Sequence, residues 1–190
     1  SKLAIITGPN HYGIGQSIAS MIDASWKTPL GLVEVDSESA LELRDGLDIL
    51  ELDSFSHSKE HSIEVQVPML QETFSHEMKI LPISLINQEQ KTATKVGSAI
   101  AKIAQKKDAL LIGSSDFTHY EENEFAHRQD LALIDPILKL DVDEFYKILY
   151  ERHVTACGFG AIASTMIACK ELGATEGKLL KYATSGDVSG

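Results

Sequence analysis

Two kinds of hydrophobic pattern alternate along the chain. Short apolar runs bounded by turn residues are typical of buried strands, and apolar residues recurring every three or four positions are typical of helices that bury one face. The runs predict strands at residues 2–7, 32–35, 79–86, 109–115 and 178–184, with a further short apolar segment at 49–52. The periodic stretches predict helices at residues 16–25, 38–44, 59–74, 90–106, 124–138, 142–151 and 158–172. Pro68 is expected to kink the third of these helices.

This alternation predicts a layered α/β fold, α/β/α, with a mostly parallel central sheet. A chain of 190 residues is the length of one domain, so residues 1–190 are expected to form a single domain. The first strand starts with no turn before it and the last pattern has nothing after it, which predicts that the full-length protein has further terminal segments. In such folds functional groups gather in loops at the carboxyl ends of strands. Two loops are expected there, residues 8–15 and 114–120.

Composition and charge exclude several classes of protein. A share of 43% hydrophobic and 24% charged residues is typical of a folded globular chain. With 17 Lys and Arg against 28 Asp and Glu, the formal charge of −11 disfavours nucleic acid and anionic membranes as partners. There is no apolar run of about 18–20 residues and no signal-peptide pattern, so a cytoplasmic protein without membrane contact is expected. Cys157 and Cys169 are expected to be free thiols on one helix.

Histidines supply the first candidate chemistry. His11 lies in a loop where Gly13 and Gly15 let the backbone turn sharply; without a third glycine or a Gly-Lys-Ser/Thr ending, phosphate binding is disfavoured. His11 is therefore a candidate metal ligand or base, with an ordinary surface histidine as the alternative. His57 and His61 are four positions apart, a spacing that can place two imidazoles on one metal. His61 is the stronger candidate, and His57 is expected at the surface.

The second loop and the last long helix carry the remaining candidates. Asp116 precedes His119 by three residues, so its carboxylate could orient the imidazole as a base or ligand; the alternative is an Asp that caps the next helix. Cys157 begins the helix at 158–172, where the positive end of the helix dipole favours thiolate. The alternative is an inert buried thiol. His76, His127 and His153 are expected to be surface or packing residues.

Five ordered segments together resemble the Memo-like proteins, which share the fold of class III extradiol ring-cleaving dioxygenases. The segments are Gly8-Pro9-Asn10-His11, Glu60-His61-Ser62-Ile63-Glu64-Val65-Gln66, Ser114-Ser115-Asp116-Phe117-Thr118-His119-Tyr120, Cys157-Gly158-Phe159-Gly160 and Tyr182-Ala183-Thr184-Ser185-Gly186-Asp187-Val188. In the dioxygenases, two histidines and a carboxylate hold a non-haem ferrous ion, and a further histidine is the base.

The resemblance assigns roles to five residues. It implies that His11 and His61 are metal ligands, that His119 is the catalytic base and that Asp116 orients it. Cys157 stands where the dioxygenases have their carboxylate ligand, and the softer thiolate shifts the metal preference. A divalent metal is expected, iron(II) first, with zinc or copper as alternatives. The resemblance also implies a radical-SAM partner in the AmmeMemoRadiSam system of microbes.

Three functions follow from these residues. The first is a metal-dependent oxidoreductase with redox or oxygenase-like chemistry on an unidentified substrate. The second is a metal-free hydrolase or transferase, in which Cys157 attacks and His119 is its base. The third is a non-catalytic module whose pocket binds a peptide or small ligand, as in the cell-motility signalling proteins among the animal relatives. Metal content separates the first two.

Overall fold

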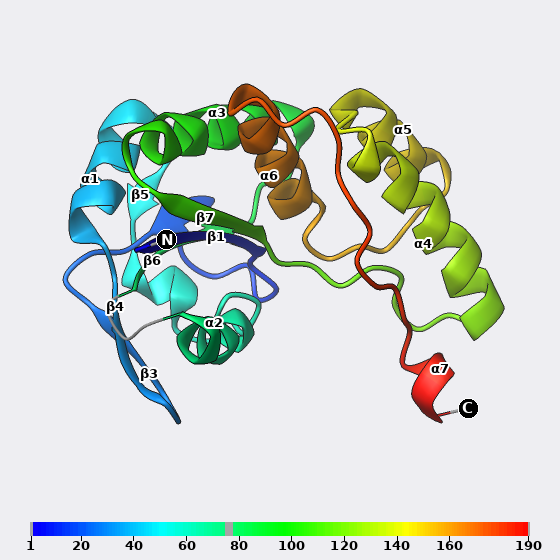
Figure 1. Ribbon diagram of the computed structural model, residues 1–190, viewed down its shortest axis with the longest axis horizontal. Coiled ribbons are helices and arrows are strands. Elements are labelled where there is room, and N and C mark those ends of the chain that lie inside the picture. Colours follow the sequence, from blue (N-terminus) through cyan, green and yellow to red (C-terminus); the bar gives the residue numbers. More distant parts are fainter. Residues whose placement is uncertain (1, 75–77, 190) are drawn as a thin grey trace.

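A computed structural model describes residues 2–74 and 78–189, and Figure 1 shows their arrangement. His76, expected to be a surface or packing residue, lies outside the described residues. The centre is a five-stranded sheet in the order β5-β2-β6-β1-β7. Its strands are β1 (Leu3–Pro9), β2 (Ile18–Ser20), β5 (Glu51–Leu52), β6 (Lys79–Leu85) and β7 (Ala109–Gly113).

Strand direction confirms the expected mostly parallel sheet. β1 runs parallel to β6 on one side and to β7 on the other, and β2 is parallel to β5 and antiparallel to β6. Every residue of β1 is buried, as expected for an unbroken apolar run in a strand covered on both faces. The carboxyl ends of β1 and β7 therefore lie side by side, and the two loops singled out in the sequence start from neighbouring strands.

Helices cover both faces of the sheet, which confirms the layered α/β class (Figure 1). One face packs on α1 (Ser37–Gly46), α3 (Gln90–Lys106) and α6 (Phe159–Glu171). The other face packs on α2 (Val67–Thr73) and on the hairpin of β3 (Ser25–Thr28) and β4 (Gly31–Glu34). A separate apolar cluster joins α4 (Asn123–Leu138) and α5 (Val142–Glu151) to α6. The short helix α7 (Gly186–Ser189) follows the C-terminal extended segment.

The prediction of a helix at residues 16–25 is wrong. The structure has strand β2 there, in which Ile18 pairs with Leu85 and Ala19 with Ser84, followed by a turn at Asp23 with a φ of 51°. An apolar pair at 18 and 19 followed by another at 21 and 22 fits a helical period. The tertiary pairing with β6 decides the conformation instead.

The single helix predicted at residues 59–74 is also wrong. Two 3₁₀ turns, Ser54–His57 and Glu64–Gln66, precede α2, which begins at Val67. Pro68 stands in the first turn of α2 and does not kink it, because proline is tolerated where helical N–H groups have no partner. The Glu60 side chain accepts the backbone N–H groups of His61 and Ser62, which competes with helix formation.

The strand predicted at residues 178–184 does not form among the described residues. This segment runs extended along α4, where the Tyr182 hydroxyl donates to Asp130, and the Gly177 N–H, just before the segment, donates to the Leu138 carbonyl. Leu179 and Leu180 remain exposed, so this apolar segment lacks the burial that a strand of the central sheet would give it. Its backbone lines one side of a cavity described below.

Candidate functional site

The loop after β1 is built to present His11. The Asn10 side chain accepts the Gly13 N–H at 3.0 Å and donates to the Ile14 carbonyl at 2.8 Å. Gly13 and Gly15 have φ values of 61° and 80°, a region that strongly favours glycine. At Gly15 a Cβ would also lie 2.1 Å from the Ser56 hydroxyl oxygen. The sharp turn predicted from these glycines is confirmed.

A buried carboxylate, Glu60, joins this loop to the segment that carries His61. Its Oε2 accepts the His11 backbone N–H at 2.6 Å, and its Oε1 accepts the N–H groups of His61 and Ser62, each at 2.9 Å. Glu60 is only 4% exposed. Burial acts to raise its pKa, but the hydrogen bonds from Ser62 and His11 outweigh burial and lower the pKa to about 2. Glu60 is therefore ionised.

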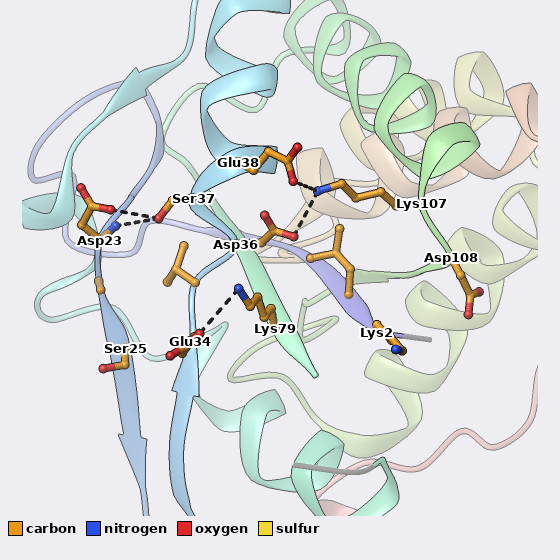
Figure 2. A pocket seen from close by; sticks show the side chains of 13 residues that line it. Lys2, Asp23, Ser25, Glu34, Asp36, Ser37, Glu38, Lys79, Lys107 and Asp108 are labelled. Atoms are coloured by element: carbon orange, nitrogen blue, oxygen red, sulfur yellow. Dashed lines mark hydrogen bonds and ion pairs between the residues drawn. The ribbon is translucent and has the colours of Figure 1, made fainter. Parts of the chain in front are cut away.

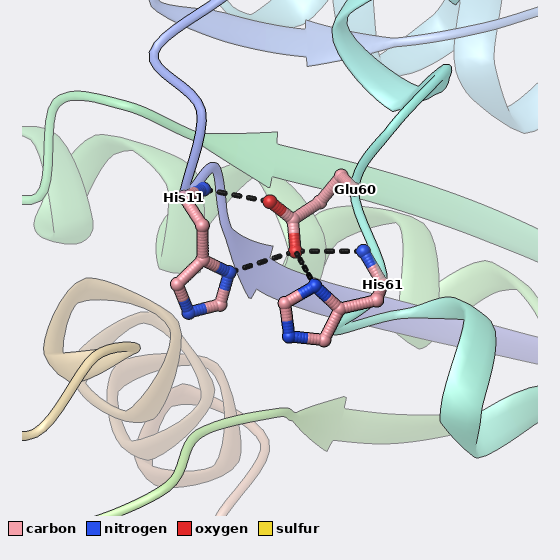
Figure 3. A group of neighbouring side chains, drawn as sticks. All are labelled: His11, Glu60 and His61. Carbon is pink, nitrogen blue, oxygen red and sulfur yellow. Dashed lines mark hydrogen bonds and ion pairs between the residues drawn. The ribbon is translucent and has the colours of Figure 1, made fainter. Parts of the chain in front are cut away.

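The two imidazoles face Glu60 with the same edge. Oε1 of Glu60 lies 2.9 Å from Nδ1 of His11 and 3.7 Å from Nδ1 of His61 (Figure 3). The rings stack with centroids 4.7 Å apart and planes 16° apart. Since an ionised carboxylate only accepts, it favours a proton on Nδ1 and leaves Nε2 with a free lone pair. Figure 3 shows both Nε2 atoms pointing away from Glu60 to the same side.

This arrangement is chemically suited to a metal ion. Ligand atoms of His11, Glu60 and His61 all lie within 4.8 Å of one another. Among the described residues, these three form the one group of His, Cys, Asp and Glu side chains close enough to hold a metal ion. Metal-binding histidines usually donate their second N–H to a carboxylate, which fixes the tautomer. Glu60 already accepts several hydrogen bonds, which fits such an orienting partner better than a direct ligand. Two imidazoles with aligned Nε2 atoms fit a divalent ion of the first transition row.

Glu60 is the site residue that sequence reasoning missed. It appeared only inside the segment Glu60–Gln66 that resembles the family. A carboxylate directly before a candidate histidine is a weak signal on its own. The structure shows its use: one side chain contacts the backbone on both sides of the site.

Cys157 lies against the loop that follows β7. Sγ of Cys157 accepts the Asp116 backbone N–H at 3.2 Å and lies 3.9 Å from the Ser115 hydroxyl oxygen. The Gly158 N–H donates to that hydroxyl at 2.8 Å. A Cβ on Gly158 would lie 2.3 Å from the Ser114 carbonyl oxygen, so only glycine allows this approach. Cys157 does not belong to the group of His11, Glu60 and His61, and its role as a third ligand stays a prediction.

His119 is held by a residue other than the one expected. Its Nδ1 lies 2.9 Å from the Thr155 carbonyl oxygen, and its backbone N–H donates to the Thr155 hydroxyl at 2.8 Å. A carbonyl accepts only, so Nδ1 carries the proton and Nε2 can act as a base. Thr155 thus performs the orienting that was expected of Asp116. The Asp116 side chain is exposed, and its part in the chemistry stays a prediction.

Hydrogen bonds connect the two halves of the site. The Ser114 hydroxyl donates to the Ser62 carbonyl at 2.7 Å and accepts from the Gln66 amide at 3.0 Å. The segment after β7 is thereby joined to the segment that carries His61. Asp116 and His119 also line a cavity of about 830 Å³, closed on its far side by α4 and by Tyr182 of the C-terminal segment.

Of two other histidines, His57 differs from expectation and His127 does not. His57, expected at the surface, is 9% exposed and packs against Trp26 with ring centroids 5.9 Å apart. Burial lowers the pKa of His57 to about 4, so the ring is neutral at pH 7. His127, expected to be a surface or packing residue, is partly exposed, and its Nε2 lies 3.1 Å from a carboxylate oxygen of Asp187.

A second cavity, of about 880 Å³, lies at the amino ends of the strands (Figure 2). Lys107 pairs there with Asp36 at 3.3 Å and with Glu38 at 3.0 Å, and Lys79 lies 3.6 Å from Glu34. Each of these lysines is thus paired with acidic side chains of the same cavity, and Asp36 also caps α1. We assign this cavity a structural role, because it lies at the end of the sheet opposite the histidines.

Fold and site together define a three-layer α/β protein with a candidate histidine metal centre. The family model described as Memo-like protein matches residues 1–190, and the chain belongs to the Memo-like family. A MEMO1 family protein of Nitrosopumilus maritimus is 58% identical over 189 residues, covering 100% of this chain and 69% of that protein. MEMO1 family proteins of Methanosarcina acetivorans and Methanopyrus kandleri are 47% and 44% identical, covering 98% and 100% of this chain and 69% and 68% of theirs.

Proposed function

We propose that this chain is a metal-dependent oxidoreductase of the dioxygenase-like class. His11 and His61 would hold a divalent ion through Nε2, with Cys157 as the third ligand. Iron(II) is the first choice, and zinc and copper are the alternatives, because imidazole and thiolate ligands suit all three. The supporting observation is the Glu60 carboxylate, which faces Nδ1 of both rings and leaves both Nε2 atoms on one side.

The bound ion would supply Lewis-acid and redox chemistry. The protein's own residues would bind and deprotonate the substrate. His119 has Nδ1 directed at Thr155 and so offers Nε2 as a proton acceptor, while Asp116 lines the same cavity. A cavity of about 830 Å³ is the size of small-molecule sites in general. We propose a small organic molecule as the substrate.

Metal analysis of anaerobically purified protein tests this proposal. The unaltered chain, loaded with iron(II), zinc or copper, should retain close to one ion per chain. His61→Ala should lose the ion, and Asp116→Ala should lower the affinity by much less, at most about 10–100-fold, because its exposed side chain is not a ligand in the proposed set. His153→Asn replaces an exposed histidine and should bind as the unaltered chain does.

Failure to bind any of the three metals would contradict the proposal. The metal-free alternative has one supporting observation, the backbone N–H of Asp116 donated to Sγ of Cys157, which favours a nucleophilic thiolate. Alkylation of Cys157 that inactivates a metal-free protein would favour this alternative. A radical-SAM partner is a further proposal, and co-purification of the two proteins would test it. In the described part of the chain, no helix is both long and apolar enough to cross a membrane.

A further inference from the structure

Gln88 lies between β6 and α3, and its side chain reaches the turn that carries Cys157. Its Nε2 donates to the Cys157 carbonyl oxygen at 2.8 Å, and its Oε1 accepts the Gly160 N–H at 2.8 Å. A carbonyl only accepts and an N–H only donates, so these two partners fix the orientation of the amide. The side chain therefore makes hydrogen bonds both before and within α6.

These bonds replace a cap that α6 lacks. The N-cap residue of α6 is Gly158, and no side chain of its own turn caps the helix. The first N–H groups of a helix have no intrahelical partner and need an acceptor from elsewhere. Oε1 of Gln88 supplies that acceptor to Gly160 from another element of the fold.

The surroundings of Gln88 are arranged for this contact. A Cβ on Gly160 would lie 2.7 Å from Cβ and 2.9 Å from Cα of Gln88, so glycine at this position lets the two segments meet. On the other side, the Tyr146 hydroxyl donates to the Gln88 carbonyl at 2.7 Å, and Tyr146 is 2% exposed. Gln88 is thus fixed through its main chain as well as its side chain.

Cys157 is consequently held from two directions. The loop after β7 binds its Sγ and its N–H through Asp116, and Gln88 binds its carbonyl. Without Gln88 the peptide of Cys157 keeps only one of these anchors, and the first turn of α6 loses its acceptor. The direction in which the thiol points would then be less well defined.

We propose that Gln88 is a positioning residue for Cys157, which caps α6 from outside and so presents the thiol to the metal site in one direction. This inference rests on the proposed function in that the presented thiol is a metal ligand. Removal of the amide should weaken metal binding by about 10–100-fold, the usual loss when a residue that orients a ligand is removed.

Anaerobic titration with cobalt(II) tests this inference, because a thiolate bound to cobalt(II) gives a near-ultraviolet charge-transfer absorption. Gln88→Ala should bind cobalt(II) about 10–100-fold more weakly and show a weaker thiolate band at saturation. Gln88→Glu keeps an acceptor for Gly160 but loses the donor to Cys157. It should therefore keep the helix content by circular dichroism and still weaken the band. Gln90→Ala, which removes a nearby exposed amide that donates to Asp143, should match the unaltered chain.

Two outcomes separate this inference from the proposed function. If the unaltered chain shows the band, and both Gln88 variants show it with unchanged affinity, the positioning role is wrong. If the unaltered chain shows no band, the proposed ligand set fails, and alkylation of the metal-free thiols then decides. If the alkylation rate of Cys157 in Gln88→Glu differs from that in the unaltered chain while the rate of Cys169 does not, the role of Gln88 is supported. If neither thiol reacts at a different rate in the variant, that role is overturned. Should Gln88→Ala fail to fold, Gln88→Glu decides in both cases.

Discussion

At the scale of single residues, Glu60 determines how the two histidines of the site are presented. Its ionised carboxylate contacts the main chain on both sides of the site and faces Nδ1 of both rings. An amide of the same shape at this position can accept with one atom only, and its NH₂ group would face backbone donors. The tautomers of His11 and His61 would then no longer be fixed from one side.

We therefore expect Glu60→Gln to weaken the binding of iron(II) or zinc by about 10–100-fold while both histidines remain. Isothermal titration under anaerobic conditions measures this, and Glu64→Gln serves as the matched control because Glu64 is exposed. Equal affinity in Glu60→Gln and the unaltered chain would show that Glu60 only supports the backbone. Complete loss, as large as that in His61→Ala, would instead make Glu60 a ligand.

His57 gives a prediction for pH. Burial lowers its pKa from 6.5 to about 4, so the unfolded chain takes up a proton at a higher pH than the folded chain. The stabilising contribution of the neutral ring is complete above pH 6.5 and is lost as the pH falls towards 4, in total about 3 kcal/mol. The corresponding window for Glu60, whose pKa falls from 4.5 to about 2, lies lower and overlaps that of His57 only between pH 4 and pH 4.5.

The free energy of unfolding, measured with urea between pH 7 and pH 4, should therefore decline less steeply in His57→Gln than in the unaltered chain. His153→Asn is the control, since an exposed histidine replaced by a residue that tolerates its positive φ should leave the slope unchanged. Parallel slopes in all three proteins would mean that His57 takes up its proton at the same pH in the folded and the unfolded chain, and that burial does not lower its pKa.

At the scale of elements, a helix or strand could be predicted from the sequence where the hydrophobic period and the tertiary contacts favour the same conformation. α3 and α5 formed at the predicted residues because period and burial agree, and Asp141 also caps α5. The helices predicted at residues 16–25 and 59–74 do not form as predicted, because other contacts override the hydrophobic period. Ile18 and Ala19 pair with a neighbouring strand, and the Glu60 side chain accepts backbone N–H groups. The candidate ligands His11 and His61 were found, whereas Glu60, Thr155 and Gln88 act through contacts with backbone distant in sequence, which a periodic pattern does not encode.

α6, the helix that follows Cys157, packs on α3, and Gly97 of α3 allows the two helices to lie close together. A Cβ at Gly97 would lie 2.6 Å from the Ser164 carbonyl and 2.8 Å from Cβ of Ile167. We expect Gly97→Ala to lower the free energy of unfolding by about 1–3 kcal/mol, as overpacking does. Gly46→Ala, at the end of α1 with no atom within 4 Å of the added Cβ, should be neutral or slightly stabilising. Urea denaturation compares the two, and equal effects would mean that the helices separate without cost.

At the scale of the whole molecule, the site depends on segments far apart in the sequence. The carboxyl ends of β1 and β7 bring His11 and the loop after β7 to one edge of the sheet, and α4 with the C-terminal segment closes the cavity beside that loop (Figure 1). Asp130, on α4, joins two of these parts. It is 3% exposed, accepts the Thr118 N–H at 3.0 Å and accepts the Tyr182 hydroxyl at 2.7 Å. One carboxylate thus holds both the loop of His119 and the opposite wall.

Tyr182→Phe removes one of these bonds and should loosen both walls of the cavity. A hydrogen bond to a charged group is worth about 1.5–3 kcal/mol, so amide exchange at Thr118 and across residues 178–184 should accelerate about tenfold or more. Hydrogen exchange read by mass spectrometry measures this, with Tyr150→Phe, an exposed tyrosine on α5, as the control. Acceleration confined to residues 178–184 would show that the segment opens alone. Acceleration at Thr118 as well would show that the cavity wall and the loop of His119 open together, so that the buried Asp130 couples access to the site with the placement of its base.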